Sequence, residues 1–336
     1  MLRPENPQQL ADALRDCAGR GETIRLGGNF SKDRLGGAGE PADVIISTSA
    51  MTELIQYEPR DLTISVSAGM RWAEFEKILR ANRQFVPLDP GWNSTVGGVV
   101  AANLSGPRRR QYGTARDMII GMKFATMEGK LVESGGMVVK NVAGLDMAKL
   151  MIGSFGTLAA IAVVNFKLFP MPAESQTFEM RFATAQEAFA ERDRILRGVL
   201  QPSAIDIVNW PSGFRLLIEA AGSAAVIERF ARDLKNARAV DARVWEEIRE
   251  FTPRFLEQNP RGAVRTISVK LSEMADSMAK LEVPAIARAG SGAIYAHYAE
   301  NAPEQAWNGD FATMEKIKHM FDPQRLLNRG RLHGRI

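Results

Sequence analysis

Cysteine, histidine and long apolar runs are all scarce in this sequence of 336 residues. The single cysteine, Cys17, excludes an internal disulfide, and it excludes a zinc or iron–sulfur cluster built from thiolates of this chain. The three histidines are His297, His319 and His333, so the first 296 residues contain none. Redox or acid–base chemistry in that long stretch must therefore come from a bound group, or from carboxylates, lysines, tyrosines and backbone.

No stretch is long and apolar enough to cross a membrane. The apolar run from Leu158 to Val164 ends at Asn165, whereas a spanning helix needs about 20 apolar residues. The opening residues MLRPENPQQL lack the apolar core of a signal peptide. We therefore expect a cytoplasmic protein, with any attachment to the inner membrane made through a complex. The net charge of +4 is too balanced to indicate a nucleic-acid partner.

The remaining composition is that of an ordinary globular protein, with 45% hydrophobic and 24% charged residues. A chain of this length favours about two domains. Short strands and helices alternate up to a long predicted strand, 158–169, which ends at Pro170 and Pro172. Two prolines directly after a strand are typical of a domain boundary, so we expect the first domain to span residues 1–172.

Hydrophobic periodicity predicts the elements of both domains. In the first domain it predicts helices over 7–18, 70–82 and 145–152, and strands over 23–26, 43–48, 62–68, 118–125 and 130–133. In the second it predicts strands over 177–182, 204–209, 214–220, 264–271 and 293–298, helices over 185–200, 224–236 and 275–280, and a final helix over 311–321. Strands and helices mixed in this way predict an α+β fold.

The first motif with chemical content is RLGGNFSK (25–32), a strand that runs into consecutive glycines. Glycines let a backbone approach a ligand closely and turn its N–H groups toward an anion. The spacing is not that of a P-loop, and no G-x-G-x-x-G occurs, so a Rossmann nicotinamide site is not indicated. By itself, a pair of glycines after a strand is more often a tight turn.

Three further segments are rich in small residues or arginine. STVGG (94–98) and AANLSG (101–106) suit a flat ring or a diphosphate, although a packed loop between domains also fits. PRRRQYG (107–113) can offset phosphate or carboxylate charge, and a solvated loop or a partner contact fits equally well. GSFGTL (153–158) opens a strand, which a plain helix-to-strand turn explains almost as well.

Together and in this order, the motifs resemble the vanillyl-alcohol-oxidase or PCMH-type FAD-binding family, and within it the FAD-binding subunits of bacterial glycolate oxidases. The resemblance covers residues 5–172 and returns at FDPQRLLNRGRL (321–332), where Arg329 replaces the usual proline. It implies a PCMH-type FAD-binding domain over 1–172, an α+β cap over 173–310, and a helix and tail, 311–336, that return to the first domain. The segments that carry it are 24–37, 57–76, 94–123 and 138–161.

The resemblance also implies where FAD binds and how it is held. Relatives that tether the flavin use a histidine or cysteine of this domain. Here the domain has no histidine, and Cys17 lies in the opening helix, so noncovalent FAD is expected. The diphosphate is expected at Gly27, Gly28, Asn29, Phe30 and Ser31, the diphosphate and isoalloxazine at Thr95, Gly97, Gly98, Asn103, Ser105 and Gly106, and the adenosine end at Gly156, Thr157 and Ile161.

Oxidation of a small 2-hydroxy acid such as glycolate is the activity implied, with hydride passing from the α-carbon to flavin N5. Such a reaction needs a base for the hydroxyl proton and a cation for the carboxylate. On predicted strands of the second domain, Arg265 is the candidate clamp and His297 the candidate base, with Tyr295 on the same strand face as His297. Each has an ordinary alternative, since isolated strand histidines are more often structural and strand arginines are usually solvated or ion-paired.

Metal and partner expectations follow from the same resemblance. Related D-lactate and D-2-hydroxyglutarate dehydrogenases carry a His/His/Glu metal constellation that is not found here, so no metal is expected. Because the chain has no cluster ligands, its electrons are expected to pass to oxygen or to a partner, and the glycolate oxidase arrangement implies separate flavin and iron–sulfur subunits.

Two functions are compatible with the sequence. The chain is either a subunit that oxidises a small hydroxy acid itself, or an FAD-carrying structural or electron-relay subunit. A sugar or aldonolactone oxidase is disfavoured because the histidine for covalent flavin is missing.

Overall fold

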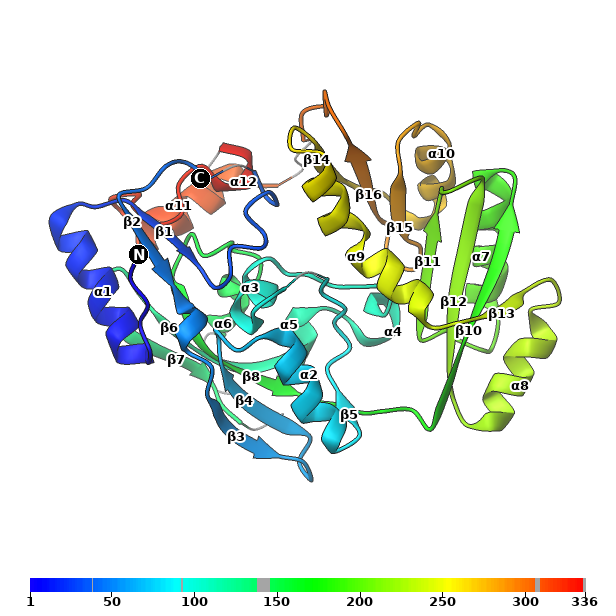
Figure 1. The fold of residues 1–336 in the computed structure, drawn as a ribbon, viewed down its shortest axis with the longest axis horizontal. Coiled ribbons are helices and arrows are strands. Elements are labelled where there is room, and N and C mark those ends of the chain that lie inside the picture. The colour runs from blue at the N-terminus through cyan, green and yellow to red at the C-terminus, as the bar shows by residue number, and fades with distance from the viewer. Residues whose placement is uncertain (38, 92, 138–145, 306–308, 335–336) are drawn as a thin grey trace.

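A computed structural model of the chain describes residues 1–37, 39–91, 93–137, 146–305 and 309–334 (Figure 1). The chain forms two bodies that lie side by side, one built on a five-stranded sheet and the other on a seven-stranded sheet. The last helices, drawn in red, lie against the first body, close to its opening helix and strands (Figure 1). Among the described residues, no helix has both the length and the apolar character that a membrane span requires.

The first body opens with helix α1, Pro7–Arg20, and a parallel strand pair, β1 (Ile24–Gly27) and β2 (Val44–Ser47). The helix predicted over 7–18 is confirmed, and its Leu10, Leu14 and Cys17 are fully buried. An isolated bridge joins Leu327 to Ile24, so the end of the chain extends this small sheet.

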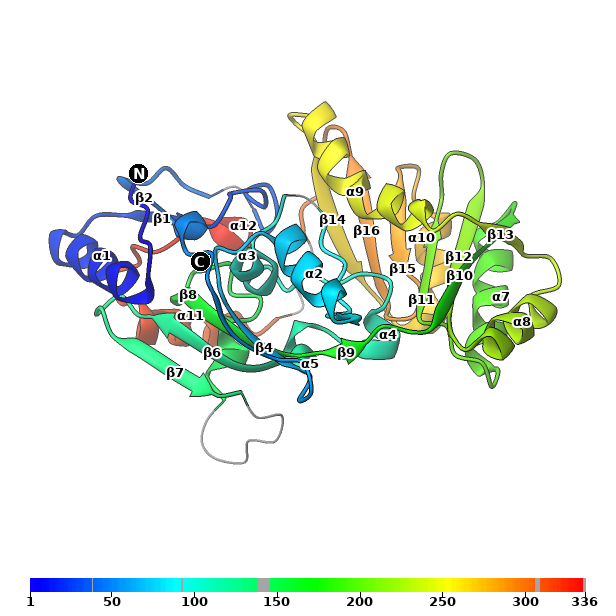
Figure 2. The same cartoon turned by 60° about the horizontal axis from the view of Figure 1, so that its bottom comes forward.

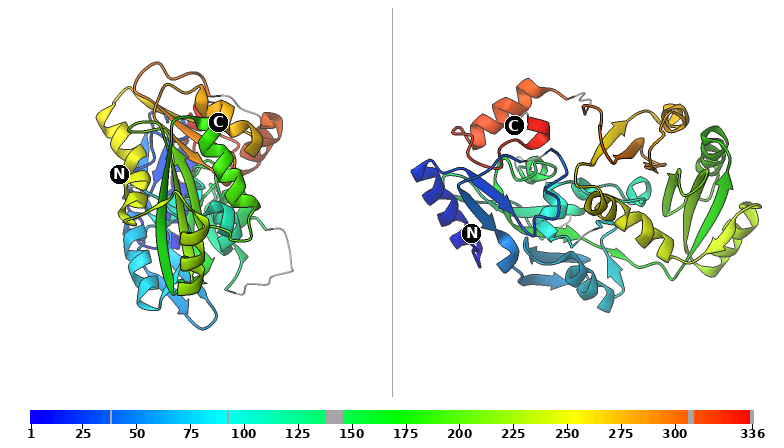
Figure 3. Two further views of the ribbon diagram at one scale, coloured as in Figure 1. Left: turned by 90° about the vertical axis from the view of Figure 1, so that its right-hand side faces the viewer. Right: turned by 45° about the horizontal axis from the view of Figure 1, so that its top comes forward.

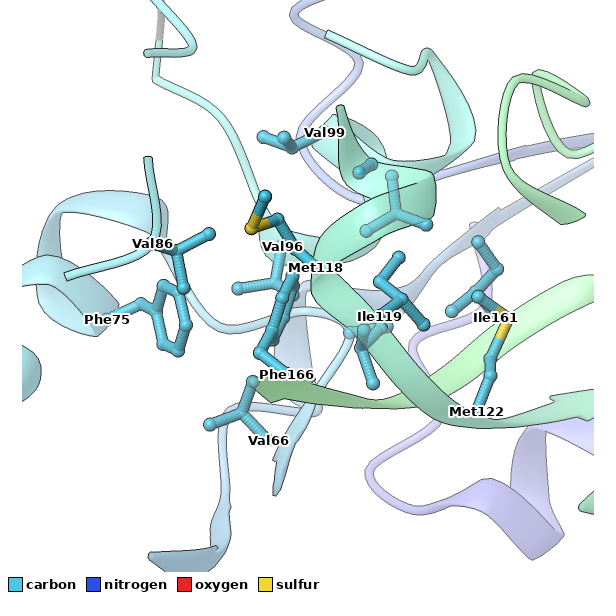
Figure 4. Packing of buried hydrophobic residues seen from close by; sticks show 14 of the residues in the cluster. Val66, Phe75, Val86, Val96, Val99, Met118, Ile119, Met122, Ile161 and Phe166 are labelled. Carbon is cyan, nitrogen blue, oxygen red and sulfur yellow. The ribbon is translucent and has the colours of Figure 1, made fainter. Parts of the chain in front are cut away.

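The main sheet of the first body is entirely antiparallel, in the order β3-β4-β8-β6-β7. Apolar side chains from its strands and from the adjoining helices meet in one core, in which Val66, Phe75, Val96, Met118 and Phe166 pack together (Figure 4). The strands are β3 (Leu54–Glu58), β4 (Thr63–Ser67), β6 (Ile119–Ala125), β7 (Leu131–Gly135) and β8 (Ala160–Lys167), and the helices are α2 (Trp72–Ala81), α3 (Val96–Ala101), α4 (Arg109–Tyr112), α5 (Ala115–Met118) and α6 (Ala148–Met151). A short pair, β5 (Gln84–Phe85) and β9 (Phe169–Pro170), leads to the second body.

The second body has the strand order β13-β10-β12-β11-β15-β16-β14. Its strands are β10 (Glu174–Phe182), β11 (Ala204–Val208), β12 (Phe214–Gly222), β13 (Arg238–Val240), β14 (Ala263–Ser268), β15 (Ala285–Arg288) and β16 (Ala293–Tyr298). One face is covered by α7 (Ala185–Arg197), α8 (Ala224–Asp233) and α10 (Met274–Ala279), and the other by α9 (Arg243–Gln258), as Figures 2 and 3 show. The chain then returns to the first body through α11 (Phe311–Phe321) and α12 (Arg331–Gly334).

Some differences from the predicted elements bear on the site. Helices α3 and α9 and strands β3, β13 and β15 are among the elements that the sequence does not predict. Pro253 lies inside α9 and argues against a helix in the sequence, although Val244 and Ile248 of this helix pack on the sheet. The helix predicted over 145–152 is a single turn, Ala148–Met151, and the motif residues 138–145 lie outside the described residues.

Candidate functional site

The glycine-rich end of β1 forms one wall of a pocket. Helix α3 and the segment around Phe155 form the facing walls, and Arg331 completes the lining from the end of the chain. Ten of the residues predicted to bind FAD are brought together here: Gly27, Gly28, Asn29, Phe30, Ser31, Thr95, Gly97, Gly98, Gly156 and Ile161.

The other four predicted residues lie outside the lining. The Thr157 hydroxyl is buried and donates to the Ser154 carbonyl at 2.7 Å. Asn103 has a φ of +48°, in the left-handed turn after α3. Ser105 and Gly106 are buried on the side of the second body, where a Cβ on Gly106 would lie 2.5 Å from Asp89 Oδ2.

Close packing explains two of the pocket glycines, and a third borders the pocket with less crowding. A Cβ on Gly28 would lie 2.2 Å from Thr95 Oγ1, and one on Gly97 would lie 2.8 Å from the Ala68 Cβ. Both are closer than real Cβ contacts allow, so these glycines let pocket elements approach one another. A Cβ on Gly98 would meet nothing nearer than 3.1 Å, and Lys32 Nζ would be 3.6 Å away. The bare backbone of Gly98 therefore faces the pocket and leaves room for a ligand.

Lys32 is a pocket residue that sequence reasoning missed. Only 9% of it is exposed, and its Nζ donates to Ser94 Oγ at 2.8 Å and to Ser31 Oγ at 3.2 Å. Burial lowers the pKa of Lys32 to about 7. The signal was present, since Lys32 ends the motif RLGGNFSK, but its burial beside the glycines is a property of the fold.

Asn328 joins two walls of the pocket from the far end of the chain. Its side-chain oxygen accepts from the Leu26 N–H at 2.7 Å, and its amide nitrogen donates to the Leu26 carbonyl at 3.0 Å and the Phe155 carbonyl at 2.8 Å. Asparagine suits this position because its backbone is left-handed, with a φ of +47°. The strand end and the 155–156 turn are thus held by one buried amide.

Two buried cations hold the same region. Lys318 is 1% exposed and donates to the Thr157 carbonyl at 2.8 Å, the Leu327 carbonyl at 2.9 Å and Asp322 at 2.7 Å. Arg331 donates to the carbonyls of Asp33, Leu35 and Gly37 and pairs with the Asp33 carboxylate at 3.0 Å. The second stretch of the resemblance, 321–332, therefore completes the pocket. Arg329, which stands where the resembling family has a proline, pairs with Glu40 at 2.9 Å.

Comparison with known proteins identifies the domain that this pocket belongs to. Residues 1–135 match the family model described as FAD binding domain. Residues 1–135 form an FAD binding domain. Glycine backbone and a buried ammonium in the pocket lining fit a dinucleotide diphosphate.

Similar proteins agree with this assignment. Glycolate oxidase subunit GlcE of Escherichia coli is 33% identical over 200 residues, 59% of this chain and 55% of that protein. Mitochondrial D-lactate dehydrogenase (cytochrome) of Arabidopsis thaliana is 30% identical over 166 residues, 49% of this chain and 29% of that protein. Glycolate oxidase subunit GlcD of Bacillus subtilis is 24% identical over 214 residues, 63% and 46% of the two chains. The chain thus spans about half the length, or less, of these relatives.

Solved structures establish the fold of the whole chain. Two structures of alkyldihydroxyacetonephosphate synthase superpose on this chain with TM-scores of 0.72 and 0.73. Each superposition covers 97% of this chain and 75% of the synthase chain. Their sequence identities are 18% and 16%, so the likeness is one of fold. The predicted α+β, PCMH-type fold is confirmed.

The FAD binding domain is tied to the second body close to its pocket. Arg34, two residues after Lys32, donates to the carbonyls of Leu256, Asn259, Pro260 and Gly262, at and beyond the end of α9. Carbonyls at a helix C-terminus lack partners within the helix and attract cations. The glycine-rich loop of the FAD binding domain is thereby fixed to the helix that covers the second sheet.

A second tie is made by Arg108, from the arginine-rich motif. Its guanidinium donates to both carboxylate oxygens of Glu219 on β12, at 2.7 and 3.1 Å, and also to Asp89 of its own domain. Ser203 donates to the same Glu219 carboxylate at 2.7 Å. The motif therefore holds an ion pair between the two bodies, in place of the solvated loop or partner contact that the sequence left open for this arginine.

A cleft of about 1440 Å³ opens beside this ion pair, between α2 of the FAD binding domain and the start of α9. Deeper in the second body, Arg288, which also lines the cleft, pairs with Asp206. Burial raises the pKa of Asp206 to about 7, although the Arg288 guanidinium beside it favours the charged form. The wall between the two bodies is thus built from paired charges.

The predicted catalytic residues are not brought together over the pocket. The register pairs Val264 with His297 and Thr266 with Tyr295, so Arg265 points to the opposite face of the sheet from both. The Arg265 Nε donates to the Pro303 carbonyl, which holds the segment after β16. In the described part of the chain, none of the three candidates lines the glycine-rich pocket or the interdomain cleft.

His297 has the surroundings of a structural residue. It is fully buried beneath α9, with the rings of Phe251 and Phe255 edge-on at 4.9 and 5.3 Å. Because the Pro284 carbonyl can only accept, the nitrogen Nδ1 donates to it at 3.1 Å, and Nε2 accepts from the Thr252 hydroxyl at 2.8 Å. Both ring nitrogens are used, so the geometry leaves none to take a proton from a substrate. The sequence could not show this because α9, which supplies three of these contacts, was not predicted.

Acid should therefore destabilise the second body through His297. Burial lowers the pKa of His297 to about 4 from its ordinary 6.5, so the stabilisation by the neutral ring is complete above pH 6.5. It is lost as the pH falls to 4, by about 1.4 kcal/mol per unit and roughly 3 kcal/mol in all.

Urea unfolding of the wild type and of His297→Gln at pH 7.5 and 4.5 should show that the difference between their free energies of unfolding is smaller in acid. His319→Gln, an exposed control on α11, should follow the wild type. Parallel pH profiles of wild type and His297→Gln would contradict this assignment.

Proposed function

We propose that this chain is the FAD-carrying subunit of an oxidoreductase that acts on small 2-hydroxy acids such as glycolate, with electrons passed to flavin and iron–sulfur partner subunits. The observation that supports it most is the pocket of the FAD binding domain, in which glycine backbone and a buried lysine face one another. The substrate class comes from the relatives, which are named glycolate oxidase subunits and D-lactate dehydrogenase.

Noncovalent attachment is part of the proposal. Cys17 is a fully buried residue of α1, and the described residues that line the pocket include neither cysteine nor histidine. Retention of the cofactor then depends on the backbone of Gly27, Gly28 and Gly98, on the charge of Lys32, and on the loop held by Arg331. The chemistry that bound FAD would supply is acceptance of a hydride at flavin N5 from the α-carbon of the hydroxy acid.

A second candidate function has an observation in its favour. An oxidation site needs a cation and a base on one side of the flavin, and Arg265 and His297 lie on opposite sheet faces, with His297 buried under α9. This placement favours a subunit that carries FAD for structure or for electron relay, while a partner subunit binds the hydroxy acid. Both candidates require FAD in the same pocket.

A visible absorption spectrum of the purified protein separates these functions. The proposal expects a flavin spectrum, released intact by denaturation, that bleaches when glycolate or D-lactate is added without oxygen. Bleaching of the isolated chain makes it catalytic by itself. Bleaching only after partner subunits are added supports the relay function. A colourless protein that takes up no added FAD contradicts both.

A further inference from the structure

The side chain of Lys32 carries a positive charge into the wall of the FAD pocket. A lysine that is only 9% exposed is uncommon, because burial of an ammonium costs free energy unless the site uses the charge. The Ser94 hydroxyl donates its proton to the Gly91 carbonyl at 2.7 Å, so its oxygen can only accept from Lys32. This network aims the ammonium at the bare backbone of Gly98, in the pocket lining.

The other charged side chains at the pocket are used to hold its loop. Arg331 donates to three loop carbonyls and pairs with Asp33 at 3.0 Å, and Arg25 pairs with the same carboxylate. Lys32 lies in the lining beside the glycines, where its ammonium donates to the hydroxyls of Ser31 and Ser94. Charge at a glycine-lined wall is what recognition of a phosphate requires.

We propose that the Lys32 ammonium binds a phosphate oxygen of the FAD diphosphate and takes up a proton as it does so. This inference rests on the proposed binding of FAD in this pocket. It makes Lys32 a binding residue for the cofactor, and it couples retention of FAD to pH.

The sign of the coupling follows from the burial of the lysine. Burial lowers the pKa of Lys32 to about 7, and a phosphate beside the ammonium favours the charged form and raises that pKa again. Affinity for FAD is then highest below pH 7 and falls as the pH rises above 7, by up to tenfold per unit. The charged groups that face this wall are Asp33, Arg331 and Arg25, which pair with one another through the Asp33 carboxylate.

The test compares three ligands on the apoprotein: FAD, ADP and riboflavin. At pH 6.5, Lys32→Met should bind FAD and ADP about 10- to 100-fold more weakly than the wild type, because a hydrogen bond to a charged group is lost. Riboflavin, which has no phosphate, should bind both proteins alike. Between pH 6.5 and 8.5 the wild type should lose affinity for FAD and Lys32→Met should not. Lys77→Met, an exposed lysine on α2, is the matched control and should behave as the wild type.

Two further measurements keep the test decisive if Lys32→Met folds poorly. Lys32→Arg keeps a charge that does not titrate near neutrality, so it should bind FAD with little dependence on pH. Calorimetry of the wild type at pH 8 in two buffers of different ionisation enthalpy should report proton uptake on FAD binding. Unchanged binding of FAD and ADP by Lys32→Met, or no proton uptake by the wild type, overturns the proposal for Lys32. A wild type that binds no FAD overturns the proposed function itself.

Discussion

Gly98→Leu should abolish retention of FAD while the protein stays folded. The Gly98 backbone is helical and faces the pocket, and a Cβ there meets only Thr95 Oγ1 at 3.1 Å and Lys32 Nζ at 3.6 Å. A leucine side chain would therefore extend into the space that a ligand needs. We expect at least about a 100-fold loss of affinity, since overlap with a bound group costs several kcal/mol. Flavin absorbance after gel filtration and the circular dichroism spectrum measure the two effects separately.

Two other glycines provide the controls for this variant. Gly19→Leu adds the same side chain in α1, where a Cβ has no neighbour within 4 Å, and should leave FAD content unchanged. Gly97→Ala should instead destabilise the domain, because its Cβ would lie 3.1 Å from the Ala68 carbonyl oxygen and 2.8 Å from the Ala68 Cβ. Normal flavin content in folded Gly98→Leu would remove α3 from the binding site.

Arg108→Met should lower the free energy of unfolding by about 2 to 4 kcal/mol. Removal of one partner from a buried ion pair leaves the remaining charges uncompensated, which costs about 3 to 5 kcal/mol in full burial. The side chain of Arg108 is 24% exposed, and that of Glu219 9% exposed, so a somewhat smaller loss is expected. Because the pair joins the two bodies, small-angle scattering should also show a larger radius of gyration. Urea unfolding measures the stability change.

A double variant tests whether the pair itself is responsible. Arg108→Met combined with Glu219→Gln removes both charges, and we expect it to be more stable than Arg108→Met alone. Arg109→Met, next in the motif, is the control for loss of a positive charge and should change stability by less than about 0.5 kcal/mol. Equal losses for Arg108→Met and Arg109→Met would contradict a specific role for the interdomain pair.

The parts of the site that sequence could predict are those determined by local backbone. The glycines of RLGGNFSK and STVGG are recognisable because they are adjacent, and ten predicted residues line one pocket. The hairpin of β6 and β7 was found because its turn residues are also local. Lys32 belongs to the motif RLGGNFSK, but its buried position involves a hydrogen bond to Ser94, 62 positions away. The local sequence therefore could not predict its burial.

The sequence could not show how the candidate catalytic residues pack, because that packing involves segments distant in the chain. Alternation along a strand correctly placed Tyr295 and His297 on one face, but could not say which face lies open. That face is covered by α9, whose Pro253 argues against a helix when the sequence is read alone. Likewise, the partner of Arg108 is on β12, more than 100 positions away, so the motif could not distinguish a phosphate contact from an interdomain ion pair.

The bond between Asn328 and Leu26 has a consequence for the order of events during synthesis. The two residues are 302 positions apart, so a ribosome that adds about 5 to 20 residues per second makes Asn328 roughly 15 to 60 s after Leu26. Until then the β1 strand end, the 155–156 turn and the 33–37 loop lack the groups that hold them. A nascent chain can assemble its first sheet early, but FAD has a finished pocket to enter only after Asn328 and Arg331 have been translated.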